Sequence, residues 1–81
     1  LRIYPDPASD VLNVGMELRG ARVVDMRVLD LAGRTVDRPS PVNMIGQERM
    51  TVDLSAYSAG SYVLQVITDR GRDERRFSVV R

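Results

Sequence analysis

Polar and apolar residues alternate along most of this chain, and a period of two favours β-strands that each have one apolar face. The residues on the apolar side form five sets: Leu12, Val14, Met16 and Leu18; Val24, Met26 and Val28; Met50, Val52 and Leu54; Tyr62, Leu64 and Val66; and Phe77 and Val79. No window carries the stripe at every third or fourth position that an amphipathic helix needs. We therefore expect an all-β chain.

Turn residues divide the alternating pattern into about seven strands, near residues 1–4, 11–18, 23–30, 34–38, 49–54, 61–68 and 73–80. Gly33 and Gly71 lie at two expected hairpin turns, Leu31–Arg34 and Asp69–Arg72. The longest loop runs from residue 38 to 48, with a short paired segment expected around residues 42–45. Seven short antiparallel strands predict an immunoglobulin-like β-sandwich that forms a single domain over residues 1–81.

Composition excludes several classes of function. The 81 residues include no cysteine and no histidine, so disulfides, thiolate metal sites and the commonest general base are absent. The net charge of +1 gives no field that would attract nucleic acid. No run approaches the roughly 20 apolar residues of a membrane helix. We expect no cofactor and no metal, and because the chain starts at Leu1 we expect it to be a piece of a longer secreted protein.

Two segments allow both an architectural and a functional interpretation. The corner from Leu54 to Tyr62 is typical of sandwiches, in which a tyrosine hydroxyl bonds back to the backbone. The final segment, residues 70–81, combines five arginines with two acidic residues. It suits either an edge strand protected by charge or a strand that another protein recognises. The scattered aspartates are typical of turns and solvated strand faces, although two of them could in principle perform acid–base chemistry.

Four segments together resemble the type A C-terminal sorting domain of the type IX secretion system. They are the opening Tyr4-Pro5-Asp6-Pro7 with its following strand, the hairpin Asp30-Leu31-Ala32-Gly33-Arg34, the corner Leu54–Tyr62, and a glycine turn followed by Arg75, Arg76 and Phe77. Two positions depart from the family pattern. Asp6 replaces the commoner asparagine, and Arg75-Arg76 replaces a pair that usually contains lysine.

The resemblance implies an immunoglobulin-like, non-catalytic label at the end of a cargo protein of a Gram-negative bacterium. Its partners would be the outer-membrane translocon, shuttle proteins and a surface sortase of cysteine-peptidase type. Its location would be the periplasm in transit and then the outer membrane, the cell surface or the medium. The candidates for recognition are Gly33, Arg34, Arg75, Arg76, Phe77 and Val79. The candidates for an architectural role are Tyr4, Pro5, Pro7, Asp30, Leu54, Gly60, Tyr62 and Gly71.

Two other functions are compatible with the residues. An immunoglobulin-like or fibronectin-like spacer or adhesion module would have the same fold, although few aromatic residues are present for binding sugars. A small carboxylate hydrolase is the third alternative. Because sandwich edges can pair, we expect the isolated domain to be a monomer or a weak edge-paired dimer.

Overall fold

The computed structural model describes residues 1–40 and 49–81 of the chain. Within these residues it contains seven strands: β1 (Arg2–Tyr4), β2 (Val11–Gly15), β3 (Val23–Asp30), β4 (Thr35–Asp37), β5 (Arg49–Asp53), β6 (Gly60–Thr68) and β7 (Gly71–Val79). They form a three-stranded sheet in the order β1-β2-β5 and a four-stranded sheet in the order β4-β3-β6-β7. Every neighbouring pair is antiparallel.

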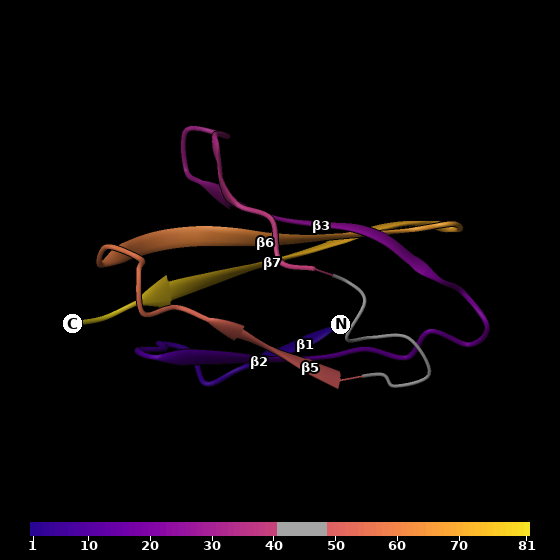
Figure 1. Ribbon diagram of the computed structural model, residues 1–81, viewed down its shortest axis with the longest axis horizontal. Helices are drawn as coiled ribbons and strands as arrows, with labels where there is room; N and C mark the ends of the chain where they lie inside the picture. The colour runs from indigo at the N-terminus through magenta and orange to yellow at the C-terminus, as the bar shows by residue number, and fades with distance from the viewer. Residues whose placement is uncertain (41–48) are drawn as a thin grey trace.

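The two sheets lie one above the other, with β1, β2 and β5 below β3, β6 and β7 (Figure 1). The first, second and fifth strands thus face the third, sixth and seventh, which is the connectivity of immunoglobulin domains. The fourth strand extends the sheet of β3 and β6. The prediction of an all-β sandwich is confirmed for the residues that the structure describes.

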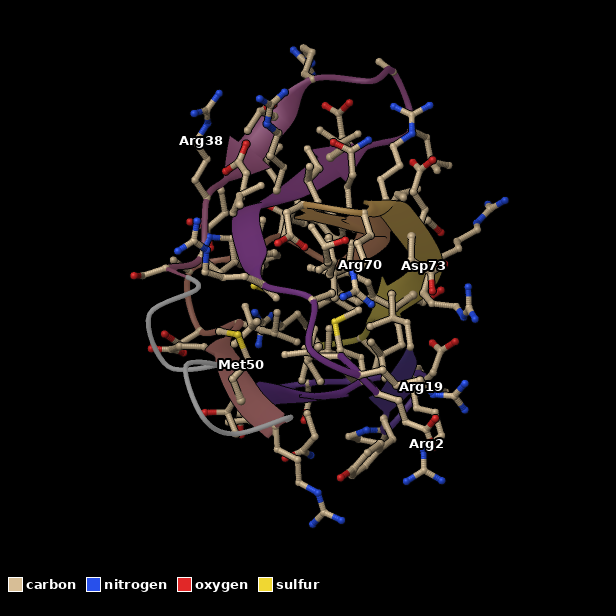
Figure 2. All side chains as sticks on the ribbon, turned by 90° about the vertical axis from the view of Figure 1, so that its right-hand side faces the viewer. Arg2, Arg19, Arg38, Met50, Arg70 and Asp73 are labelled. Atoms are coloured by element: carbon tan, nitrogen blue, oxygen red, sulfur yellow. The ribbon has the colours of Figure 1, made fainter. Side chains whose placement is uncertain are left out.

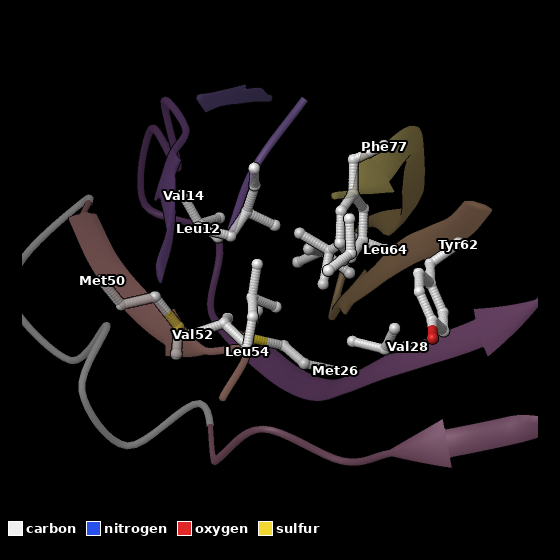
Figure 3. Packing of buried hydrophobic residues seen from close by; sticks show 13 residues of the cluster. Leu12, Val14, Met26, Val28, Met50, Val52, Leu54, Tyr62, Leu64 and Phe77 are labelled. Atoms are coloured by element: carbon white, nitrogen blue, oxygen red, sulfur yellow. The ribbon is translucent and has the colours of Figure 1, made fainter. Parts of the chain in front are cut away.

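The core lies between the sheets and is mostly aliphatic, with the rings of Tyr62 and Phe77 included. Leu12, Val52 and Leu54 from one layer face Leu64, Met26 and Phe77 from the other (Figure 3). Cross-strand register explains why the alternating residues meet, because partners such as Val28 and Leu64 place their side chains on the same face. Each apolar set predicted from the sequence contributes to this core through most of its members.

Val24 is an exception, because its side chain is 50% exposed. The pairing of β3 with β6 shifts register between Val23 and Asp25, which inserts one extra residue. A bulge of this kind reverses which side chains point inward, so Val23 rather than Val24 packs against the core. The expectation that Val24 faces inward was wrong.

Strand β2 ends at Gly15 rather than continuing to residue 18. The chain then turns between the sheets, where the Ala21 N–H donates to the Leu18 carbonyl over 2.8 Å. Arg19 and Gly20 both have positive φ, 49° and 85°, which is the signature of a type I′ turn. The segment predicted to pair around residues 42–45 lies outside the described residues.

Candidate recognition surface

The β3–β4 hairpin is closed by the carboxylate of Asp30. Its Oδ1 accepts the backbone N–H groups of Ala32 and Arg34, each over 2.9 Å, and its Oδ2 accepts Arg34 Nε over 2.8 Å. These bonds, with that from the Arg34 backbone the strongest, hold the pKa of the Asp30 carboxyl below its ordinary value of 3.8. Gly33, between Ala32 and Arg34 in this turn, has a φ of 85°, a backbone conformation that disfavours residues with a Cβ.

The tip of this hairpin projects from the body of the sandwich (Figure 1). Leu31 is 60% exposed, and the side chain of Arg34 is 81% exposed although it pairs with Asp30. Gly33 and Arg34 are therefore accessible to a partner, whereas Asp30 shapes the turn that presents them.

The corner between β5 and β6 is fixed by two tyrosines. The Tyr62 hydroxyl donates to the Ser58 carbonyl over 2.6 Å, so the tyrosine corner expected from the sequence forms. The Tyr57 hydroxyl donates to Asp37 of β4 over 2.7 Å. Burial raises the pKa of the Tyr57 hydroxyl above its ordinary value of 10.0, and the bond to Asp37 raises it further.

The Tyr62 ring lies between two other rings. It contacts the Tyr57 ring edge-on, with centroids 5.2 Å apart, and stacks with Phe77 at 5.7 Å. Leu54, at the start of the corner, is fully buried. Asp53 begins the turn by accepting the Ser55 N–H over 2.9 Å, and that bond lowers the pKa of its carboxyl.

The proline-rich opening carries the chain from β1 to the outer edge of β7. Asp6 Oδ1 accepts the Ser78 N–H over 3.0 Å, and the Ala8 N–H donates to the Ser78 carbonyl over 2.8 Å. Ala8 forms a parallel bridge with Val79. Asp6 thus performs a task that an asparagine oxygen could also perform. Tyr4 is 43% exposed, and its carbonyl accepts a bond from Asn13.

Strand β7 divides the remaining recognition candidates into two groups. Phe77 and Val79 are 1% and 2% exposed and belong to the core, so a partner that binds the folded domain cannot touch them. Arg75 and Arg76 are exposed. They line a shallow groove of about 700 Å³ between β1 and β7, together with Leu1, Arg2, Ile3, Tyr4 and Asp6.

The exposed candidates do not form one continuous site. Gly33 and Arg34 adjoin β4, whereas Arg75 and Arg76 belong to β7, and these strands lie at opposite edges of the four-stranded sheet. Figure 2 views the end of the sandwich near Arg2, Arg70 and Asp73, where several arginine side chains project outward.

Sequence reasoning missed two groups of polar contacts. Arg75 Nη1 lies 2.9 Å from Asp73 Oδ1. Because residues two apart on a strand point to the same face of the sheet, the sequence could have suggested this pair. Arg81 donates to the carbonyls of Ser9, Leu54 and Tyr57. No local pattern signals this second set, because it joins three distant segments.

Among residues 1–40 and 49–81, no three potential ligands of the His, Cys, Asp or Glu type gather as a metal site. The same residues include no helix with the length and apolarity to cross a bilayer. What the surface does offer is an exposed hairpin tip and a charged strand edge on a sandwich that closes its own core.

The fold and its exposed surface define a small immunoglobulin-like β-sandwich module. The model of the secretion system C-terminal sorting domain family matches residues 2–80, so the chain belongs to that family. It is a C-terminal sorting signal of the type IX secretion system, and the cargo of such a signal is a secreted or cell-surface protein. No curated protein matches the chain.

Proposed function

We propose that residues 1–81 form a non-catalytic label that directs an attached cargo from the periplasm through the outer membrane. The observation that carries the proposal is the family match over residues 2–80, which spans nearly the whole chain. As a C-terminal sorting domain, the label would lie at the C-terminal end of its parent protein, and it would itself be no enzyme whatever the activity of that parent. The label needs neither a cofactor nor a metal.

A label that works on unrelated cargoes must fold without their help, and the sandwich supports this requirement. Its core residues come from both sheets of the same chain, and its turns are held by its own side chains, such as Asp30 and Tyr62. Recognition then falls to exposed residues. Gly33 and Arg34 at the hairpin, and Arg75 and Arg76 on β7, are the proposed contacts.

The proposed partners are the outer-membrane translocon and its shuttle proteins, followed by a surface sortase of cysteine-peptidase type. The sortase would cut before the sandwich and join the cargo to the cell surface. The compact fold supports this order of events, because a closed sandwich leaves the preceding segment as the accessible substrate. Cargo location would therefore change from the periplasm to the outer surface or the medium.

A fusion experiment tests the proposal. Residues 1–81 are joined to a reporter that carries a periplasmic signal, and the reporter is expressed in a host with a type IX system and in the same host without the translocon. We expect the reporter on the surface or in the medium only when the translocon is present. A reporter that stays in the periplasm of the competent host would overturn the proposal and favour the spacer or adhesion module.

A further inference from the structure

Strand β7 differs from the other edge strands of the sandwich. Within the described residues, β1 and β4 have three residues each and β5 has five, whereas β7 has nine. Short edges offer little backbone for another chain to pair with, and long edges offer much. The open side of β7 is therefore the place where an added strand would gain the most hydrogen bonds.

The outward backbone groups of β7 belong to every second residue. Ser78 directs its N–H and carbonyl away from β6, since they bond to Asp6 and Ala8. By the alternation of an antiparallel ladder, Arg72, Glu74 and Arg76 direct theirs to the same side. Among the described residues, the proline-rich opening covers the strand at its Ser78 end.

Glu74 is covered by its own neighbours. Asp73 Oδ1 accepts the Glu74 N–H over 2.9 Å, and Arg75 Nη1 donates to the Glu74 carbonyl over 2.8 Å. The same Arg75 nitrogen lies 2.9 Å from Asp73 Oδ1. We call this arrangement of Asp73 and Arg75 around Glu74 the edge clip. Because both side chains are substantially exposed, at 39% and 47%, the clip is held weakly and can be displaced.

Charge indicates what can pair with this edge. The side chains of Arg72 and Arg76 are exposed and make no ion pair with the described residues, and Glu74 lies between them. A second copy of β7 centred on Glu74 would place Glu74 opposite Glu74 and Arg72 opposite Arg76. Like charges directly opposite one another disfavour that register on the face of Arg72, Glu74 and Arg76, whereas Asp73 and Arg75 would lie opposite each other on the other face. A foreign strand that places acidic side chains opposite Arg72 and Arg76 would instead be attracted to this edge.

We propose that an extended segment of the export machinery pairs with the β7 edge from Arg72 to Arg76, displaces the edge clip, and places acidic side chains opposite Arg72 and Arg76. This inference rests on the proposed function and names the contact by which the label is read. The added strand would gain main-chain bonds from β7 and would border the groove between β7 and β1. The edge clip keeps the backbone of Glu74 occupied until that partner arrives.

Two substitutions of Arg76 distinguish the contribution of its backbone N–H from that of its charge. Arg76→Pro removes an N–H that faces away from β6, so the β6–β7 ladder keeps its bonds, and proline is tolerated at such edge positions. Arg76→Ala removes the same charge and keeps the N–H. In the reporter fusion we expect export of Arg76→Pro to fall at least about tenfold below that of Arg76→Ala, with both variants folded by thermal unfolding.

Equal export by the two folded variants would overturn the strand-pairing proposal. Failure of the wild-type fusion itself would instead count against the proposed function. If Arg76→Pro does not fold, a second pair decides: Arg76→Glu against Arg22→Glu, which carries the same charge change on an exposed side chain of the β2–β3 connection. We expect only Arg76→Glu to lose export, and equal export by this pair would overturn the proposal.

Discussion

Tyr62 shows how one hydroxyl fixes the path of the chain between the two sheets. Its side chain is 8% exposed, and its hydroxyl bond to Ser58 satisfies a carbonyl at a corner where the ladder ends. We expect Tyr62→Phe to lower the free energy of unfolding by about 1–1.5 kcal/mol, because one partly buried bond is lost while the ring keeps its packing. For a domain of this size, the melting temperature should fall by about 5–10 °C in calorimetry.

Tyr4→Phe is the matched control for that substitution. The Tyr4 side chain is 43% exposed, and its hydroxyl makes no hydrogen bond with the residues that the structure describes. Its melting temperature should stay close to that of the wild type. Equal losses in the two variants would mean that the corner does not depend on the Tyr62 hydroxyl.

At the scale of elements, the β3–β4 hairpin should respond to acid. Since folding lowers the pKa of Asp30, its carboxylate stabilises the hairpin above the ordinary value of 3.8, and the contribution disappears as the pH falls through the folded pKa. We expect Asp30→Asn to be less stable than the wild type at pH 7. The gap should close at acidic pH, which urea unfolding at pH 7 and at about pH 2.5 measures.

If the stability difference between the wild type and Asp30→Asn stays unchanged in acid, the loss of stability comes from altered packing of the turn rather than from the lost carboxylate charge. Asp25→Asn serves as a comparison, because Asp25 pairs with Arg27 on the strand but accepts no turn N–H. Its substitution removes an ion pair from a partly exposed surface, and such pairs contribute little.

The sequence predicted the elements well because period two and turn glycines are local signals. All seven strands fall within a few residues of their expected positions, and the apolar sets of β5, β6 and β7 face the core as expected. The errors lie where a bulge or a turn interrupts the alternation of polar and apolar residues. A bulge turned Val24 outward, and the turn at Arg19 and Gly20 follows a strand that ends early.

The candidate site was harder to predict than the strands. Alternation alone placed Phe77 and Val79 on the core face, while the family resemblance added them to the recognition candidates; the structure buries both. The edge clip could not be expected without knowing which side of β7 is open, since that depends on the order of strands in the sheet. Asp6 reaches Ser78 across 72 residues of sequence, a separation that no local pattern reports.

At the scale of the whole molecule, Arg81 adds side-chain bonds between the end of the described chain, the segment before β2 and the corner after β5. Its guanidinium donates to the Ser9 carbonyl over 2.9 Å and to the Tyr57 carbonyl over 2.7 Å, and it also bonds the Leu54 carbonyl. Asp10 lies 3.8 Å away and adds an opposite charge. The end of the described chain is thereby tied to the corner and to the segment before β2.

We expect Arg81→Ala to lower the free energy of unfolding by about 1–3 kcal/mol, because bonds from a charged group to three carbonyls are lost together. Arg81→Lys should recover only a small part, since one ammonium keeps the attraction to Asp10 but lacks the planar fork that reaches several carbonyls. Thermal unfolding of both variants and of Arg22→Ala measures the effect. Arg22 is the control because its side chain makes no bond with the described residues, and a lysine variant as stable as the wild type would reduce the role of Arg81 to its charge.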